Sequence, residues 1–235
     1  MTYLHSQNLV PETAIAQLEA LTQLLQQTLH KSLLGLILHG SAASAGFEVE
    51  RSDLDVLAII DSELTHMQHQ TVGEGMLWIS NEPHPLEFSI IVKEDLDNWS
   101  HPCKHVFHYG EDKREAFSVG RFKPDVLADE DLAGHITMAR ARGIDLLGNY
   151  PPERLPFIPR EDYLSAILSD IQWAQNQQED LDYYSVANAC RTMAYLDSGA
   201  ILSKSEGIEW CRDNNIDTSK IVEEVTTKLR LELGL

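Results

Sequence analysis

The chain has 235 residues, 43% of them apolar and 23% charged, which is enough for one large globular domain or two small ones. Its 18 Lys and Arg against 37 Asp and Glu give a formal net charge of −19, which disfavours a nucleic-acid backbone as partner. The three cysteines are scattered without a CxxC pair, which indicates a reducing compartment and argues against structural zinc.

The sequence shows no sign of a membrane or secretory segment. No apolar stretch approaches the roughly 20 residues of a membrane span, and the N-terminal residues lack the basic-then-apolar layout of a secretion signal. We therefore expect a soluble protein of the cytoplasm, without a membrane partner. The acidity suits a cationic partner, although it can equally serve solubility alone.

In chain order, the apolar pattern predicts a mixed first half of the chain. Leucines recur at helical spacing after Pro11, which suits a first helical turn. Apolar runs that are bounded by turn residues predict strands. The predicted elements are a helix over 11–31, strands on either side of the segment 40–52, a polar helix or loop over 61–70, and strands over 75–80 and 85–92.

Beyond Val92 the strand signals fade and helical periodicity takes over. The predicted helices cover 131–147, 161–178, 183–198, 204–213 and 217–231. The breaker GNYPP, over 148–152, places a domain boundary after residue 150. The sequence thus predicts an α+β fold, with a mixed sheet and flanking helices over 1–150 and an α-helical bundle over 151–235.

The segment between the first two predicted strands carries the strongest chemical signal. Gly40-Ser41 follows a buried strand, where a glycine lets the backbone approach phosphate oxygens and a hydroxyl can donate to them. Asp53 and Asp55 start the next strand and share one of its faces because side chains alternate along a strand. Two carboxylates so close together repel unless a cation lies between them, and Mg²⁺ with a nucleotide fits best. Ser52 is a further candidate phosphate donor.

A third carboxylate follows on the predicted strand over 85–92. Glu87 is opposite in phase to the apolar residues of that strand, so its side chain faces away from the core. It is a candidate third metal ligand, or a general base for an attacking hydroxyl. It also fits an ordinary outward-facing glutamate. Together, Gly-Ser, Asp-x-Asp and a later acidic residue on a strand form the pattern of a nucleotidyltransferase.

The chain also resembles the aminoglycoside nucleotidyltransferases, and within them the streptomycin/spectinomycin 3''- or 9-adenylyltransferases. The resemblance spans most of the chain. In the first half it rests on HGSAASAGFEVERSDLDVL, LEFSIIV, HYGEDKRE and ARARGIDLLGNYP. In the second half it rests on CRTMAYLDSGAILSKSEGIEW, which is the more specific stretch because the first-half motif is shared by a very large superfamily.

The resemblance implies ATP as co-substrate, two Mg²⁺ ions, a cationic aminoglycoside as acceptor, and a monomer. Residues 1–150 would form the nucleotidyltransferase domain, and residues 151–235 a helical domain that clamps nucleotide and substrate. The implied roles are metal binding by Asp53, Asp55 and Glu87, proton removal by Glu87, nucleotide binding by Gly40, Ser41, Ser52, Arg191 and Lys204, and substrate binding by Glu87, Trp173 and Asp182.

The sequence departs from the family at three places. The loop after Trp173 is shorter, so none of its acids, Glu179, Asp180 and Asp182, matches the family spacing. Asp112 stands where the family often has a second tryptophan, and the C-terminus lacks the late tyrosine that touches nucleotide in relatives. Three histidines, His101, His105 and His108, have a spacing that suits a metal on a helix, but Pro102 lies within the run, so we interpret it as a loop.

Two alternatives remain open on the sequence alone. In the first, the enzyme transfers the nucleotide to a different hydroxyl, of another small molecule or of a protein. This reaction uses the same motif, so the motif does not exclude it. A catalytically inactive nucleotide-binding module is also compatible with the fold, although the retention of all three carboxylates argues against it.

Overall fold

The computed structural model describes residues 10–44, 46–50, 52–120, 127–176 and 183–235. Its contacts divide the chain into two compact units. The sheet unit comprises Met1–Asp129 and Met138–Pro156, and the helical unit comprises Glu130–Thr137 and Phe157–Leu235. The predicted fold class, a mixed sheet with helices followed by a helical region, is confirmed.

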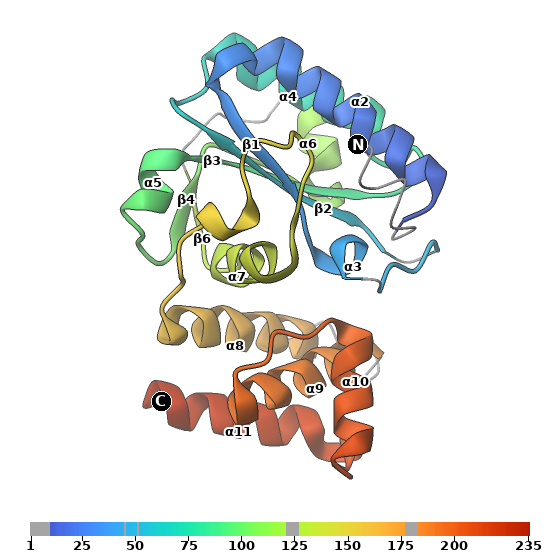
Figure 1. Ribbon diagram of the computed structural model, residues 1–235, viewed down its shortest axis with the longest axis vertical. Coiled ribbons are helices and arrows are strands. Elements are labelled where there is room, and N and C mark those ends of the chain that lie inside the picture. Colours follow the sequence, from blue (N-terminus) through green and yellow to red (C-terminus); the bar gives the residue numbers. More distant parts are fainter. Residues whose placement is uncertain (1–9, 45, 51, 121–126, 177–182) are drawn as a thin grey trace. The chain divides into compact units, whose positions relative to one another are not determined.

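The sheet unit is built on a five-stranded mixed sheet in the order β5-β3-β2-β1-β7. Figure 1 labels its central strands β1, β2 and β3. β2 and β3 are parallel, whereas the other neighbouring pairs are antiparallel. The strands are β1 Leu33–Leu38, β2 Leu54–Ile60, β3 Leu86–Val92, β5 Phe107–Tyr109 and β7 Ile144–Asp145. A separate pair of strands, β4 Cys103–His105 and β6 Leu127–Asp129, is antiparallel.

The helices of the sheet unit begin with α2, which buries its leucine stripe against the sheet. Leu18, Leu21 and Leu25 are fully buried, because their helical spacing puts them on one face. In Figure 1, α2 and α4 run over the same face of the sheet. The helices are α2 Glu12–Leu29, η1 His30–Ser32, α3 Gly40–Ala43, α4 His66–Ile79, α5 Lys93–Asp97, η2 Glu111–Lys113, α6 Arg114–Ser118 and η3 Pro152–Arg154, and α7 Leu132–Arg142 contributes residues to both units.

The predicted strand over 75–80 is wrong, because these residues end helix α4. A capping box between Thr65 and Gln68 starts this helix. A Cβ on Gly73 would lie 2.7 Å from Phe117 Cδ1, and a Cβ on Gly75 would lie 2.2 Å from Leu24 Cδ2. These glycines therefore permit close packing of α4 against its neighbours and do not mark a turn.

Four short strands lie where the sequence predicted none. β4, β5, β6 and β7 have only two or three residues each, too few to show an alternating pattern. The run 101–108, which we expected to be a loop, contributes β4 and β5. The helix expected over 131–147 ends at Arg142 and is followed by β7.

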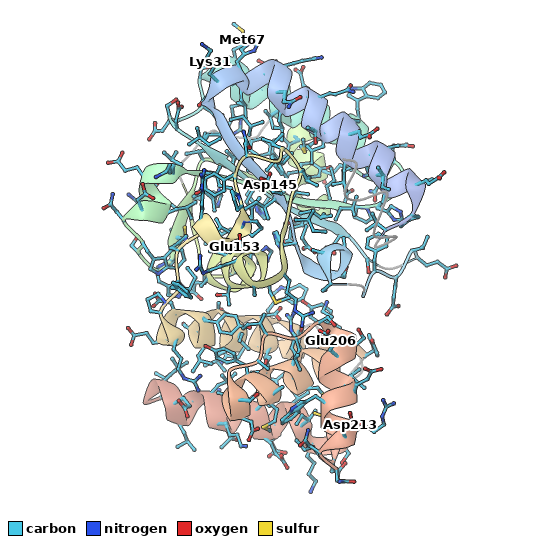
Figure 2. The ribbon with its side chains drawn as sticks, viewed as in Figure 1. Lys31, Met67, Asp145, Glu153, Glu206 and Asp213 are labelled. Atoms are coloured by element: carbon cyan, nitrogen blue, oxygen red, sulfur yellow. The ribbon has the colours of Figure 1, made fainter. Side chains whose placement is uncertain are left out.

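The helical unit contains the four helices that the periodicity of its sequence predicts. They are α8 Arg160–Asn176, α9 Tyr183–Ser198, α10 Lys204–Asp213 and α11 Ile221–Leu233, with the short turn η4 Thr218–Lys220 before α11. A capping box between Ser203 and Glu206 starts α10; Figure 2 labels Glu206 in its first turn and Asp213 at its end. The core of the unit includes Leu164, Leu168, Ile171, Cys190, Met193, Cys211, Ile221, Val225 and Leu229.

None of the helices in the described ranges is long and apolar enough to cross a membrane.

Candidate active site

The site is built where the parallel strands β2 and β3 begin. Asp55 and Glu87 are partners in the register of the two strands, and Asp53 directly precedes β2. Each of the three offers a carboxylate oxygen, and these oxygens lie within 4.8 Å of one another. Because Leu54 and Val56 point into the core, the alternation of the strand places Asp55 on the opposite face. All three acidic residues remain partly exposed.

The donor set of this carboxylate cluster fits magnesium. Three carboxylates at this separation repel one another when no cation is bound, so a divalent ion relieves an existing repulsion. Hard oxygen ligands select Mg²⁺, Ca²⁺ or Mn²⁺ over the metals that prefer sulfur or imidazole. Asp53, Asp55 and Glu87 are thus the residues that would hold the ion.

Gly40 lies directly against this cluster. It adopts a left-handed backbone with φ +64°, and a Cβ at this position would lie 1.8 Å from Asp55 Oδ2. The backbone of His39 donates a hydrogen bond of 2.9 Å to the carbonyl oxygen of Asp55. A glycine is therefore needed here twice, for its backbone angle and for the absence of a side chain.

The two serines of the predicted phosphate site differ in their surroundings. Ser41 Oγ is buried and has no hydrogen-bond partner among the described residues, which is unusual for a buried hydroxyl and leaves it able to donate to a ligand. Ser52 Oγ accepts a bond of 2.9 Å from the backbone of Glu48, and the backbone of Ser52 donates to the carbonyl of Glu48. Ser52 thus closes the loop before Asp53, although its hydroxyl proton can still be donated.

In the helical unit, Arg191 and Lys204 come from two closely packed helices. A Cβ on Gly207 would lie only 2.6 Å from the backbone nitrogen of Arg191, so α9 and α10 touch backbone to backbone there. Lys204 is one turn before Gly207, at the first position of α10. The close approach therefore brings the start of α10 beside the middle of α9.

Tyr184 interacts with both of these cations, and it belongs to no motif that could have marked it in the sequence. Lys204 Nζ lies 3.9 Å from the centroid of the Tyr184 ring. The Tyr184 hydroxyl donates to Asp170 Oδ1 at 3.2 Å, and Asn188 Nδ2 donates to Asp170 Oδ2 at 3.0 Å. Burial, with the charge of Asp170, raises the pKa of Tyr184, while the nearby charge of Arg191 lowers it. Tyr184 is thus a neutral aromatic support for the lysine.

The predicted substrate residues are placed only in part. Trp173 lies on α8 with 60% of its surface exposed, which makes it accessible to a ligand. Asp182 lies outside the described residues. Asp112 is exposed in η2, and its Oδ1 is 2.7 Å from where a Cβ of Gly110 would be.

The three histidines of the run 101–108 do not gather into a metal site in the described part of the chain. His101, His105 and His108 join no group of three possible ligands there. His108 Nδ1 is 2.8 Å from Ser89 Oγ, and the rings of His105 and His108 are 5.6 Å apart.

A mixed sheet that presents three carboxylates at the start of two parallel strands, next to a short helix that begins with Gly40-Ser41, is typical of a nucleotidyltransferase. The family model for the C-terminal domain of aminoglycoside adenylyltransferase matches residues 153–219. The spectinomycin 9-adenylyltransferase of Enterococcus faecalis is 27% identical over 195 residues, which are 80% of this chain and 76% of that protein. An aminoglycoside (3'')(9) adenylyltransferase of Klebsiella pneumoniae is 28% identical over 157 residues, or 64% of this chain and 59% of that one.

The fold has a solved counterpart. A crystal structure of the spectinomycin adenyltransferase of Enterococcus faecalis with ATP and spectinomycin superimposes with a TM-score of 0.75 at 25% identity. The match covers 94% of this chain and 90% of that chain. In sequence and in fold, the chain is thus similar to aminoglycoside adenylyltransferases.

Proposed function

We propose that the protein transfers AMP from ATP to a hydroxyl of an aminoglycoside-type antibiotic, with spectinomycin, streptomycin or both as acceptors, and so confers resistance. The observation that carries this proposal is the convergence of Asp53, Asp55 and Glu87 at the start of β2 and β3. The names of the relatives and the ligands of the solved counterpart support the choice of ATP and of this class of acceptor.

In this proposal Asp53 and Asp55 hold Mg²⁺, and Glu87 shares the ion and removes the proton of the acceptor hydroxyl. The acceptor oxygen bonds to the α-phosphorus of ATP, the bond from that phosphorus to the bridging oxygen breaks, and pyrophosphate leaves. Bound Mg²⁺ neutralises charge on the phosphates. Because the reaction needs little covalent help from the protein, holding the two reactants in line is the main task of the site.

The nucleotide and the acceptor have separate sets of residues in this proposal. Gly40, Ser41 and Ser52 approach the phosphates from the sheet unit. Arg191 and Lys204 supply positive charge for the triphosphate. Trp173 and Asp182 contact the acceptor, and the net charge of −19 attracts a polycationic antibiotic. The reaction needs the ATP of the cytoplasm and neither a membrane nor a nucleic acid, and a monomer is sufficient for it.

The proposal is tested by pyrophosphate release from ATP and Mg²⁺ with a panel of aminoglycosides. We expect release with at least one of spectinomycin and streptomycin, and a loss of at least about a hundredfold in Glu87→Gln. The control is Asp61→Asn, since Asp61 lies exposed just after the opposite end of β2, bound to Ser32 and Ser62. Host cells that carry the wild type should tolerate the drug, and those that carry Glu87→Gln should not.

One observation favours a second candidate, the same transfer to another hydroxyl. Asp112 stands where the family that the sequence resembles often has a tryptophan, so a residue that the resemblance assigns to the acceptor differs in shape and charge. Pyrophosphate release with a different small molecule or a protein, and none with any aminoglycoside, would support this candidate. If no acceptor leads to pyrophosphate release, an inactive nucleotide-binding module is favoured.

A further inference from the structure

We propose that Glu111 is a positioning residue for Glu87: through two separate routes it holds the two residues that flank Glu87 in β3. The inference rests on the proposed function, in which Glu87 is both a metal ligand and the base. Glu111 itself does not belong to the carboxylate cluster, and nothing in its sequence position marks it as more than an acidic residue after a glycine.

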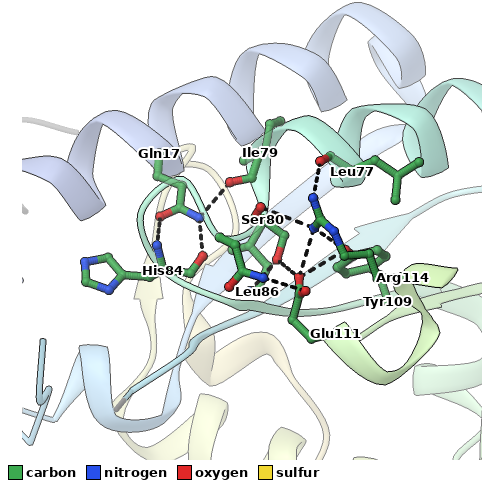
Figure 3. Close-up of polar contacts among 10 residues, drawn as sticks. Gln17, Leu77, Ile79, Ser80, His84, Leu86, Tyr109, Glu111 and Arg114 are labelled. Carbon is green, nitrogen blue, oxygen red and sulfur yellow. Dashed lines mark hydrogen bonds and ion pairs between the residues drawn. The ribbon is translucent and has the colours of Figure 1, made fainter. Parts of the chain in front are cut away.

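The Glu111 carboxylate accepts four hydrogen bonds, as Figure 3 shows. Its Oε1 accepts from Ser80 Oγ at 2.5 Å, from the Tyr109 hydroxyl at 3.1 Å and from Arg114 Nη1 at 3.3 Å. Its Oε2 accepts from Asn81 Nδ2 at 2.6 Å. A carboxylate is suited to this place because it offers only acceptors, and bonds to a charged acceptor are stronger than neutral ones.

The first route runs through Ser80, which is fully buried. Its hydroxyl donates to Glu111 and accepts a hydrogen bond of 2.9 Å from the backbone nitrogen of Leu86. Leu86 is the first residue of β3 and directly precedes Glu87. Because the single proton of Ser80 points to Glu111, its lone pairs are oriented toward the strand.

The second route runs through Tyr109. Its hydroxyl donates to Glu111, and its backbone is paired with Phe88 in the register of β3 and β5. Phe88 directly follows Glu87, and both aromatic residues are fully buried. Glu87 is therefore held from both sides by backbone whose position depends on one carboxylate.

Arg114 anchors the network to the end of α4. Its Nη2 donates to the carbonyl of Leu77 at 2.8 Å, and its Nη1 lies 3.4 Å from the carbonyl of Ser80. In Glu111→Gln, one carboxylate oxygen becomes an amide NH₂, so one of the donors that now meet Glu111 faces another donor. The bonds from Ser80, Tyr109 and Arg114 also lose their charged acceptor and weaken, so the start of β3 is held less firmly. A misplacement of about 1 Å in a catalytic group can cost about a hundredfold in rate.

The experiment compares Glu111→Gln and Ser80→Ala with a matched control at the opposite edge of the sheet. The control is Asp145→Asn; Figure 2 labels Asp145, which lies in β7. Asp145 also accepts several bonds, from the backbone nitrogens of Leu147, Gly148 and Tyr150. Two readouts are taken on correctly folded protein: the affinity for Mn²⁺ alone, and kcat and KM for ATP in pyrophosphate release.

We expect Mn²⁺ binding to weaken several-fold and kcat to fall about ten- to a hundredfold in Glu111→Gln and Ser80→Ala, with the KM for ATP nearly unchanged. Asp145→Asn should lower stability and leave Mn²⁺ affinity and kcat as they are. The double variant should be no worse than the poorer single one, since residues in one network are not additive. If Glu111 had only a structural role, its substitution would change the amount of folded protein but neither the Mn²⁺ affinity nor kcat.

The possible failures are distinguishable. Loss of activity in Glu87→Gln together with wild-type kcat and Mn²⁺ affinity in Glu111→Gln would overturn the positioning role and leave the proposed function standing. If the wild type adenylylates no acceptor, the proposed function fails and Mn²⁺ affinity alone decides the positioning role. If Glu111→Gln does not fold, Ser80→Ala, which keeps the carboxylate and its other donors, decides it.

Discussion

Asp55 and Glu87 are direct partners across the parallel strands β2 and β3, so the distance between their carboxylates is fixed by the sheet and not by a loop. The pairing continues from Leu54 with Leu86 to Ile60 with Val92, and nearly all of the residues that follow are buried. The sheet therefore keeps these negative charges close together, and a bound cation should raise the stability of the folded protein.

Mg²⁺ should stabilise the wild type. At ten times its dissociation constant a ligand that binds only the folded state adds about 1.4 kcal/mol, which for a chain of this length raises the midpoint of thermal unfolding by about 3–6 °C. Asp53→Asn should lose this rise, because one of the three ligands is replaced by a neutral amide. Scanning calorimetry with and without Mg²⁺ measures it. Asp61→Asn serves as control, and an equal rise in both variants would contradict a site at the start of β2.

Gly40→Ala adds only one methyl group, yet it should strongly disrupt the site. The new Cβ would overlap Asp55 Oδ2, so the carboxylate must move, and activity should fall about a hundredfold or more. Gly148→Ala is the matched control, because Gly148 also has a positive φ, of +75°, and has no atom within 4 Å of an added Cβ. Both variants should lose similar stability from backbone strain, about 1 kcal/mol. Equal rates in the two would show that Asp55 has room to move.

Lys204→Gln should weaken ATP binding about tenfold, since a hydrogen bond to a charged group is worth about 1.5–3 kcal/mol. Tyr184→Leu should have a similar effect, because it removes the ring on which Lys204 rests. Tyr184→Phe keeps that ring and should retain the wild-type KM. Steady-state kinetics in ATP measures all three, with the exposed Lys220→Gln as control. A wild-type KM for ATP in Lys204→Gln would contradict a role of this lysine in nucleotide binding.

Acid should destabilise the protein through its buried histidines. Burial lowers the pKa of His84, and also of His69 and His105. In the unfolded chain a histidine takes up its proton at about pH 6.5, whereas the native ring stays neutral until lower pH. The unfolded state therefore binds more protons in this window, and the free energy of unfolding falls as the pH drops below about 6.5.

His84 offers the direct test of this pH dependence. Its ring makes an edge contact with Phe47, which His84→Phe can keep. Urea unfolding at pH 7 and pH 5 should show a smaller loss of stability in His84→Phe than in the wild type. Equal losses in the two proteins would mean that His84 titrates alike in the folded and unfolded states.

Much of the site follows from local sequence, because its parts lie on long, strongly patterned elements. The alternation around Asp55 and around Glu87 is enough to put each on the polar side of its strand. The sequence could not show that the two strands are parallel neighbours in register. That pairing depends on a crossover helix between them, and the residues 75–80 at its end were misassigned as a strand.

That error has a physical origin. Two parallel strands need a long connection, which α4 provides, whereas a strand at 75–80 would have suggested a hairpin with β3. Gly73 and Gly75 weaken the helical pattern when the sequence is considered alone, yet they are required by the packing of Phe117 and Leu24. Tyr184 and Glu111 were missed for a related reason: their partners are distant in sequence and belong to no motif.

The division of the chain also limits how the protein can be dissected. Residues 130–137 group with the helical unit, whereas 138–156 return to the sheet unit. Neither unit is therefore one continuous stretch of sequence. A gene fragment that starts at Phe157 lacks residues 130–137, which belong to the same unit. Splitting the protein for complementation, or exchanging its helical half with that of a relative, should succeed only when 130–137 travels with the second half.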